Sequence, residues 1–426
     1  MAETSHKSRI SRFVAWIDER IPLTETLERH ATKYYAPKNF NFWYYFGILA
    51  TLMLVIQILT GIWLTMAYVP SGDGAFASVE YIMRDVEYGW LLRYLHSTGA
   101  SFFFIVVYLH MFRGFAYGSY RKPRELLWLL GMGIYLILMA EGFFGYLLPW
   151  GNMSYWGAQV IISLFGAVPG IGPGLSEWIR GDFVVSDATL NRFFAFHVIL
   201  VPLLLSLLVY LHIVALHKVG GNNPDGIDIK KNKDASGKPL DGIAFHPYYT
   251  IKDNLGVAVM MTALLAVVFF VPELGGWFLE KDNFAPADVL QTPPDIVPLW
   301  YLTPYYSILR AVTFEWLPGG AKLWGVLAMG AAIVVLFFLP WLDRSPVRSI
   351  RYRGWMYKTA LTLFVVTFVM LGYLGTRNPS HVDLVLLKNV TWSQIGLVVY
   401  FAFFLLMPIY TRMDRTKPEP DRVTGQ

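Results

Sequence analysis

The chain has 426 residues, of which 55% are hydrophobic and only 15% are charged, and its formal net charge is +5. This composition excludes a soluble protein with an ordinary core and predicts an all-α integral membrane protein that crosses the bilayer several times. Because the chain has no cysteine, it excludes disulfides, thiolate metal sites and cofactors attached through Cys-X-X-Cys-His.

Eight apolar stretches follow a polar, basic and aromatic segment at residues 1–40. That first segment contains no apolar core, so no cleavable signal peptide is expected. Each later stretch approaches the roughly 20 residues that a spanning helix needs. The predicted spans cover about 42–67, 89–116, 124–148, 190–217, 254–272, 321–341, 356–375 and 391–411.

Lysine and arginine are distributed unequally between the two sets of loops. They are concentrated in the N-terminal segment, in the loops after the second, fourth and sixth spans, and in the C-terminal tail. Because such residues stay on the cytoplasmic side, both termini are predicted to be cytoplasmic. The even number of spans agrees with this orientation.

The first two spans share a period of fourteen residues. Gly47 and Gly61 have this separation in the first span, and His96 and His110 have it in the second. Fourteen residues make four helical turns less about 40°, so both members of a pair leave one face. With a rise of about 1.5 Å per residue, the two histidines are about 21 Å apart. One therefore lies near each side of a hydrocarbon core about 30 Å thick.

The third and fourth spans repeat this arrangement. Gly131 and Gly145 are fourteen residues apart in the third span, and His197 and His212 are fifteen residues apart in the fourth. The fifteen-residue spacing still leaves both imidazoles nearly on one face. The additional residue falls between His197 and Pro202, and we expect a local bulge there because proline already frees a backbone carbonyl.

The depth of each histidine in the membrane determines which two histidines form a pair. The second and fourth spans run in the same direction, so His96 pairs with His197 near the outer face and His110 with His212 near the inner face. Zinc usually requires more ligands in one cluster, whereas haem accepts axial imidazoles. The sequence therefore predicts two non-covalent haem b groups in a bundle of the first four spans. For a single histidine, hydrogen bonding to a neighbouring helix remains an alternative.

Glycine and arginine support the haem interpretation. The four glycines are predicted to leave room for the haem ring, the alternative being helix–helix contact through small residues. Guanidinium groups form charge-assisted hydrogen bonds with carboxylates such as haem propionates. The alternative is that these basic side chains, which lie near the ends of spans, extend to the lipid headgroups. The candidates for propionate contact or haem packing are Arg93, Arg113, Arg192 and Ser119.

Two long outer segments are expected to have structure of their own. Residues 150–185 contain the stretch WGNMSYWGAQVIISLF, which is amphipathic and is predicted to lie along the outer surface. The connection 273–320 is rich in proline and aromatic residues, with TPPDIVPLWY at its centre. Connections of this length usually bind something. The basic loop DIKKNKDASGKP on the inner side is read as a solvated loop that sets orientation.

Several motifs identify a family. The histidine pattern occurs with YLLPWG (146–151), NRFFAFH (191–197), NNPDG (222–226), FHPYYTIKD (245–253) and PLWY (298–301). Together they resemble cytochrome b of the ubiquinol–cytochrome c reductase complexes, in the fused form of bacteria and mitochondria. The resemblance covers about residues 30–411.

The resemblance implies an organisation and a function. Residues 1–40 would be a cytoplasmic segment, 41–220 a dihaem bundle with an outer surface helix, 221–411 the remaining helices with a quinol-site loop, and 412–426 a cytoplasmic tail. The outer haem would have the low potential and the inner haem the high potential. Ubiquinol would be oxidised at the outer side, and one electron would cross through both haems to quinone at the inner side.

The resemblance also implies site residues and partners. The motif positions for quinol oxidation are Tyr146, Gly157, Pro298, Trp300 and Tyr301, and those for quinone reduction are His217, Lys252 and Asp253. The partners would be a Rieske iron–sulfur protein, a c-type cytochrome subunit, a second copy of the complex and membrane lipids, with no nucleic acid. The location would be the bacterial inner membrane or, alternatively, the mitochondrial inner membrane.

One position departs from the family motif. Leu299 replaces the glutamate of Pro-Glu-Trp-Tyr, and leucine cannot accept a proton. We expect Glu141, on the face of Gly145 and one turn deeper, to take this role, although an acid in a span can also simply bond to a neighbouring helix. Glu273 and Glu315 are weaker alternatives because nothing in the sequence fixes their direction.

Two other functions are compatible with histidines in spans. A simpler dihaem anchor of a quinone reductase would lack a structured 273–320 connection. A transporter with histidine-lined cavities would bind no haem, and a reduced-minus-oxidised spectrum would distinguish it.

Overall fold

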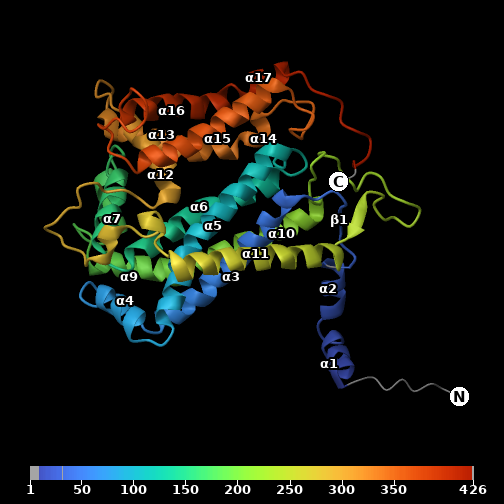
Figure 1. Ribbon diagram of the computed structural model, residues 1–426, viewed down its shortest axis with the longest axis horizontal. Helices are drawn as coiled ribbons and strands as arrows, with labels where there is room; N and C mark the ends of the chain where they lie inside the picture. Colours follow the sequence, from blue (N-terminus) through green and yellow to red (C-terminus); the bar gives the residue numbers. More distant parts are fainter. Residues whose placement is uncertain (1–8, 31, 425–426) are drawn as a thin grey trace.

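The protein is described by a computed structural model that covers residues 9–30 and 32–424. Its long helices lie roughly along one direction (Figure 1). They are α3 (Tyr45–Thr65), α5 (Gly89–Tyr117), α6 (Glu125–Leu147), α9 (Asp187–Ala195) with η2 (Phe196–Leu200) and α10 (Val201–Val219), α11 (Tyr248–Phe270), α13 (Gly320–Phe337), α15 (Trp355–Gly375) and α16 (Asn389–Leu405).

Shorter elements lie at the two ends of these helices. They are α1 (Arg9–Asp18), α2 (Leu23–His30), β1 (Tyr35–Pro37), η1 (Phe42–Tyr44), α4 (Ala75–Arg84), α7 (Asn152–Phe165), α8 (Gly172–Arg180), β2 (Gly242–Ala244), η3 (Leu274–Gly276), η4 (Lys281–Phe284), η5 (Trp300–Leu302), α12 (Thr303–Ala311), α14 (Leu339–Leu342) and α17 (Met407–Met413). We call the end with β1, β2 and the last described residues the terminal end, and the end with α4, α7 and α8 the opposite end (Figure 1).

The described chain has seven helices that are long and apolar enough to cross a membrane, or eight if the bent pair α16 and α17 is one span. The span predicted at 391–411 corresponds to this bent pair, and the chain bends by 60° between its two helices. Pro408 explains the break, because proline lacks the N–H for the i→i−4 hydrogen bond and its ring clashes with the carbonyl of residue i−4. The span predicted at 321–341 likewise ends earlier, at Phe337, and Pro340 follows in α14.

The bulge predicted in the fourth span is confirmed. Residues Phe196–Leu200 form a π-helical turn between α9 and α10, immediately before Pro202. A π-turn accommodates one extra residue without ending the helix. It therefore absorbs the fifteenth residue of the spacing and keeps the two histidines on one face.

The helices pack in two groups. In the first, α3 packs on α5, α6 packs on α10, and α11 lies against α3 and α5. In the second, α12, α13, α15 and α16 pack on one another and lie beside the first group (Figure 1). These helices are apolar on nearly all sides, as expected for helices surrounded by lipid and by other helices.

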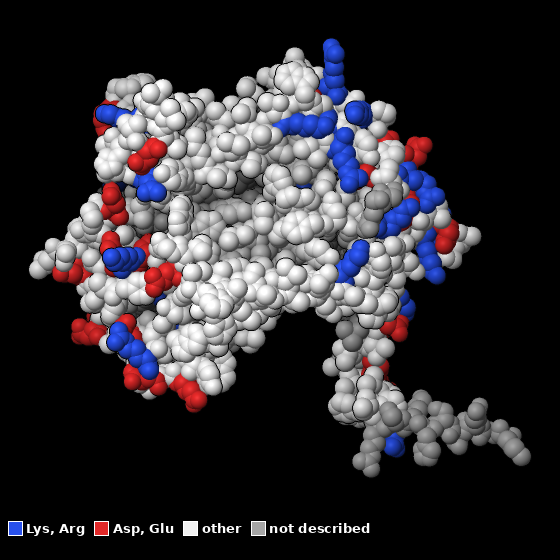
Figure 2. Space-filling model, viewed as in Figure 1, with Lys and Arg blue, Asp and Glu red and all other residues white. Residues whose placement is uncertain are grey.

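Charged residues gather at the two ends of the molecule. Figure 2 shows a broad middle band with almost no Lys, Arg, Asp or Glu on the visible face, and blue residues concentrated towards the terminal end. An uncharged band between two charged ends is the pattern expected of a membrane protein.

The outer segment at 150–185 is packed more closely than expected. It forms α7 and α8, and one face of α7 is buried through Met153, Tyr155, Ala158 and Ile162. Tyr155, Ala158 and Ile162 join a core cluster with Leu147 and with residues before and within α9. The segment therefore forms a wall against α6 as well as a surface.

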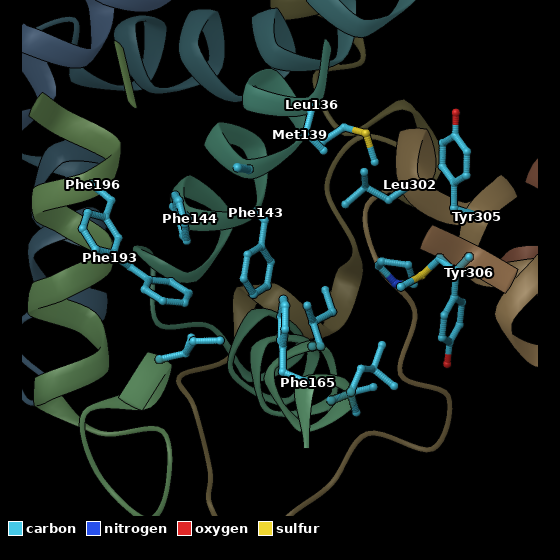
Figure 3. Close-up of a pocket in the computed structure, with 18 of the residues that line it drawn as sticks. Leu136, Met139, Phe143, Phe144, Phe165, Phe193, Phe196, Leu302, Tyr305 and Tyr306 are labelled. Atoms are coloured by element: carbon cyan, nitrogen blue, oxygen red, sulfur yellow. The ribbon is translucent and has the colours of Figure 1, made fainter. Parts of the chain in front are cut away.

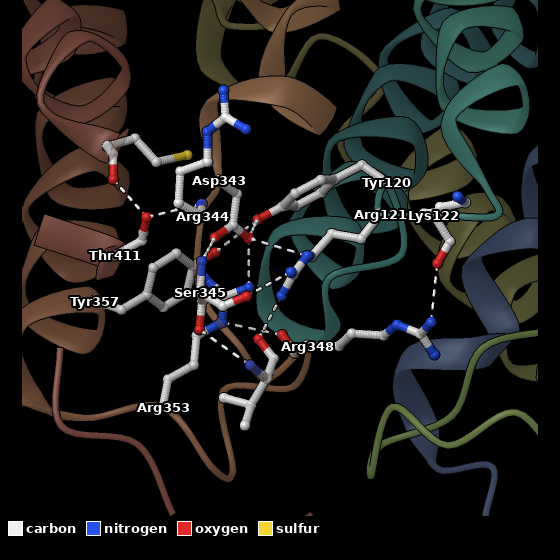
Figure 4. A network of polar contacts seen from close by, with 12 residues as sticks. Tyr120, Arg121, Lys122, Asp343, Arg344, Ser345, Arg348, Arg353, Tyr357 and Thr411 are labelled. Atoms are coloured by element: carbon white, nitrogen blue, oxygen red, sulfur yellow. Dashed lines mark hydrogen bonds and ion pairs between the residues drawn. The ribbon is translucent and has the colours of Figure 1, made fainter. Parts of the chain in front are cut away.

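A buried ionic network holds the terminal end together (Figure 4). Asp343 lies 2.5 Å from the Arg353 guanidinium and 3.8 Å from that of Arg121, and it accepts a hydrogen bond of 2.7 Å from Tyr120. Burial alone would raise the pKa of Asp343, but Arg353 and Arg121 lower it below its ordinary value. The network joins the loop after α5 to the loop after α14.

The C-terminal segment docks on the first half of the chain. Arg422 donates to Asp241 at 2.9 Å, and the Thr424 amide and hydroxyl donate to Asp225 at 2.9 Å and 2.8 Å. Val423 between them is buried. The predicted tail is therefore not a free extension within the described residues.

Candidate functional site

Two pairs of histidines face each other inside the first helix group. The ring centroids of His96 on α5 and His197 on η2 are 6.0 Å apart, and those of His110 and His212 are 6.4 Å apart. Two metal–imidazole bonds of about 2 Å each, together with the reach from each nitrogen to its ring centre, span about 6 Å. Each pair therefore has the separation needed to hold one metal between its rings.

The pair of His96 and His197, which was predicted to be the outer one, has its second ring nitrogens occupied. Nδ1 of His96 lies 3.0 Å from the Thr60 hydroxyl. Nδ1 of His197 lies 3.1 Å from both the backbone carbonyl and the carboxylate of Glu141. When Nδ1 is used in this way, Nε2 is left as the ligand atom, and the partner fixes the orientation of the ring.

Each predicted glycine lies against one histidine. A Cβ at Gly47 would come 3.5 Å from Cε1 of His110, and a Cβ at Gly61 would come 3.1 Å from Cε1 of His96. On the other side, Gly131 faces His212 at 3.3 Å, and a Cβ at Gly145 would overlap His197. The glycines thus make room first for the imidazoles, so the structure gives them a more direct role than clearance of a ring edge.

Two arginines near the histidines have no carboxylate partner among the described residues. Arg93 lies one turn before His96, and Arg113 one turn after His110, on the same helix face in each case. Nε of Arg113 is buried without a hydrogen-bond partner, and its guanidinium lies over the ring of Tyr44 at 4.8 Å. Arg93 is partly buried and makes no hydrogen bond to any described residue. Unpaired cations at both levels fit an anionic group such as a haem propionate.

The other two propionate candidates have partners in the protein. Arg192 is exposed and donates to the carbonyl of Trp178 at the end of α8. The hydroxyl of Ser119 accepts a hydrogen bond of 3.2 Å from Asn222. These contacts hold the loops around the bundle.

A cavity of about 600 Å³ opens at the opposite end, beside the outer histidine pair. Figure 3 shows Phe143 and Phe144 of α6, Phe165 of α7 and Tyr306 of α12 around it. The lining is almost entirely apolar and aromatic, as is typical of sites for a ring with a hydrocarbon tail.

Two of the five predicted quinol residues line this cavity, namely Gly157 and Pro298. The other three stand behind its wall. Tyr301 stacks on Phe104 with centroids 3.6 Å apart, and the Trp300 indole donates to the Ser101 hydroxyl at 3.0 Å.

Tyr146 has a carboxylate partner that the sequence did not suggest. Its hydroxyl donates to Oε2 of Glu280 at 2.9 Å. Glu280 precedes η4 in the long connection, and burial raises its pKa to about 7 although the Tyr146 hydrogen bond acts in the opposite direction. The acid predicted for this role, Glu141, instead contacts His197 and does not line the cavity.

The predicted inner-side residues lie around a group of aromatic rings at the terminal end. The His217 ring stacks on Tyr34 with centroids 4.6 Å apart. Lys252 donates to the Tyr248 hydroxyl at 2.8 Å, and Asp253 beside it is partly buried. β1 and β2 hold this region together, since Tyr35 pairs with Ala244.

The chain is similar to known proteins over nearly its whole length. The family models described as cytochrome b/b6/petB and cytochrome b(C-terminal)/b6/petD match residues 31–220 and 286–401. Cytochrome b of Allochromatium vinosum is 61% identical over 416 residues, which are 97% of this chain and 98% of that protein. Cytochrome b of Rhodospirillum rubrum is 46% identical, with 97% and 96% covered. A solved structure described as hyperthermophilic respiratory Complex III has a TM-score of 0.84 and 37% identity, covering 94% of this chain and 99% of that chain.

Proposed function

The chain belongs to the cytochrome b family and is the catalytic membrane subunit of a quinol–cytochrome c reductase, and on this premise we propose which of its residues perform each step. As a cytochrome b it binds haem b. The number of haems, the two quinone sites and the partners below are our proposals.

Two haems are held by the two histidine pairs. His96 and His197 would hold the outer, low-potential haem, and His110 and His212 the inner, high-potential haem. When bound, each haem supplies a one-electron carrier at its own level of the membrane. The role of the chain is to fix the imidazoles, and Thr60 and Glu141 do so for the outer pair through the Nδ1 atoms.

The unpaired arginines bind the acidic edges of the haems. Arg93 would neutralise a propionate at the outer level and Arg113 at the inner level. This proposal is supported by the buried Nε of Arg113, which lacks a hydrogen-bond partner.

Quinol is oxidised in the cavity at the opposite end, which we assign to the outer side of the membrane. The apolar lining would bind the quinol ring and tail and exclude water. Gly157 and Pro298 form part of this wall, and Tyr146, Trp300 and Tyr301 support it from behind.

Quinone is reduced at the terminal end, which we assign to the inner side. His217 and Asp253 would supply protons to the two quinone oxygens, because histidine titrates near neutral pH and aspartic acid is a common general acid in enzymes. The positive charge of Lys252 would stabilise the ionised carboxylate of Asp253 beside it.

The subunit works in a complex. Complex III as the structural neighbour implies partner subunits, and we propose a Rieske iron–sulfur protein, a c-type cytochrome and a second copy of the complex. The multi-span fold would lie in a bacterial inner membrane with both termini on the cytoplasmic side.

The facing imidazoles at two levels carry this proposal. In the purified complex, His96→Leu and His110→Leu should each remove one of two b-type bands from the reduced-minus-oxidised spectrum. His381→Leu, an exposed histidine in the loop before α16, is the matched control and should keep both bands. A single band in the wild type, or two bands in all three variants, would contradict the assignment.

The cavity is tested separately. Gly157→Leu adds a branched side chain to its wall, and Gly330→Leu adds the same side chain where a Cβ meets no atom within 4 Å. We expect the first variant to lower quinol oxidation by about 10-fold or more, since a misfit of one methylene costs about 1–3 kcal/mol. Equal rates in the two variants would place quinol elsewhere.

A further inference from the structure

The proposed quinol cavity contains no proton acceptor. None of the described residues that line it is aspartate or glutamate. Leu299, which stands where the family motif has glutamate, is buried and apolar. A quinol loses two protons as it is oxidised, so a base must lie within hydrogen-bond reach of the cavity, directly or through one intermediary.

Tyr146 connects the cavity wall to a carboxylate. A Cβ at Gly157, a lining residue, would lie 3.7 Å from Cε1 of Tyr146, so the tyrosine ring stands directly behind the wall. Its hydroxyl donates to Glu280 at 2.9 Å. From the cavity outwards, the order is therefore Gly157, Tyr146 and Glu280.

Glu280 also lies next to water. It is partly buried and follows the buried residues Phe278 and Leu279, whereas Lys281 and Asp282 after it are exposed. A carboxylate in this position separates an apolar interior from the solvent at the opposite end of the molecule. A proton that it accepts can leave along the exposed side of the loop.

Other titratable groups lie near Tyr146 and Glu280. Tyr301 on η5 is close enough that Glu280 and Glu141, after burial, raise its pKa, and Asp282 acts on Tyr146 from the same loop. Glu141 on α6 is hydrogen-bonded to His197. Neither tyrosine is a base at neutral pH, because the ordinary tyrosine pKa is about 10.

The two weaker candidates from the sequence, Glu273 and Glu315, do not line the cavity. Glu273 is exposed at the end of α11. Glu315 is also exposed, and its carboxylate accepts the Ala321 amide at 3.1 Å at the start of α13.

We propose that Glu280 is the base for quinol oxidation and that it acts through Tyr146. The inference rests on the proposed function of the cavity. Gly157 carries no side chain, so at this point of the wall a quinol hydroxyl approaches Tyr146. The hydroxyl transfers its proton to the Tyr146 oxygen as the Tyr146 proton moves to the Glu280 carboxylate. Tyr146 stays neutral, Glu280 becomes a neutral acid, and it then releases the proton to the outer solvent. The electrons leave to the acceptors of the established reaction.

The test compares matched substitutions in the purified complex. Glu280→Gln removes the base, Tyr146→Phe removes the intermediary, and Glu280→Asp keeps a carboxylate. Glu273→Gln is the control, since it makes the same change at an exposed acid in the same connection. Each variant is first checked for normal haem spectra. The rate of haem reduction by quinol is then measured from pH 5.5 to 9.

We expect wild type, Glu273→Gln and Glu280→Asp to share a rise in rate that follows ionisation of one group near neutral pH. Glu280→Gln and Tyr146→Phe should lose this rise and be slower by about 100-fold, the lower range for general base catalysis. A second measurement does not depend on turnover. The infrared carboxylic acid band that titrates near pH 7 in wild type should be absent from Glu280→Gln.

Three results would overturn the proposal. In the first, Glu280→Gln has the rate and pH profile of wild type while Gly157→Leu still slows quinol oxidation. The cavity would then remain the quinol site, but Glu280 would not be its base. The second is loss of the pH dependence in Glu141→Gln alone. The third is an unchanged rate in Gly157→Leu, which would remove the cavity assignment and this inference with it.

Discussion

Replacing Gly145 with alanine should displace His197. A Cβ at Gly145 would lie 2.8 Å from Nδ1 and 2.9 Å from Nε2 of His197, and closer still to Cε1. Nonbonded heavy atoms ordinarily approach to about 3.5–4.0 Å. The imidazole must therefore move by more than about 0.7 Å, which exceeds the tolerance of about 0.5 Å for a functional ligand.

The expected change in the free energy of unfolding results from two opposing effects. Overpacking costs about 1–3 kcal/mol, whereas replacing glycine with alanine inside a helix gains about 1 kcal/mol. At Gly47 a Cβ meets His110 at 3.5 Å, an ordinary contact, so only the gain should remain. Gly145→Ala should thus be less stable than Gly47→Ala by about 1–3 kcal/mol.

The assay is the reduced-minus-oxidised spectrum together with thermal unfolding of the purified complex. Gly47→Ala should keep both haem bands and an unchanged or higher Tm. Gly145→Ala should lose or shift the outer-haem band and lower the Tm. An unchanged spectrum and Tm in Gly145→Ala would refute the reasoning, because it would mean that α6 and η2 separate at no cost.

Further predictions concern the inner side. His212→Leu should remove the inner haem, whereas His217→Leu should keep both, as checked by the same spectrum; the reverse result would contradict the pairing. Asp253→Asn should slow reoxidation of the inner haem by quinone and leave its reduction intact, which stopped-flow spectroscopy measures; slowed reduction would indicate a structural role. Asp241→Asn should release the C-terminal segment to protease at pH 7. Burial alone would raise the pKa of Asp241, but hydrogen bonds, first from Arg422, lower it from 3.8 to about 2. Its stabilising contribution is therefore present above pH 3.8 and is lost as the pH falls through 2; equal cleavage of variant and wild type would refute this.

The paired histidines could be predicted because a helix is rigid. The spacing of His96 and His110 fixes their common face and their separation before any tertiary structure is known. The π-turn could be predicted as well, since the fifteen-residue spacing and Pro202 both indicate a local irregularity. In each case the signal lies within one helix.

The Glu280 contact could not be predicted in this way. It joins α6 to a connection without periodicity, and the partners are 134 residues apart. Loop backbones have no repeating geometry from which the direction of a side chain follows. The bend after Leu405 did have a signal in Pro408, but the apolar run through it resembles one continuous span.

The docking of the C-terminal segment has a consequence for biosynthesis. Thr424 and Asp225 are 199 residues apart in the chain. At a synthesis rate of about 5–20 residues per second, Asp225 waits roughly 10–40 s for this partner. During that interval the loop after α10 is held only by contacts made earlier, such as the hydrogen bond from Asn39 to Asp225. The terminal end of the nascent bundle is thus fastened late, after the helices up to α17 have been synthesised.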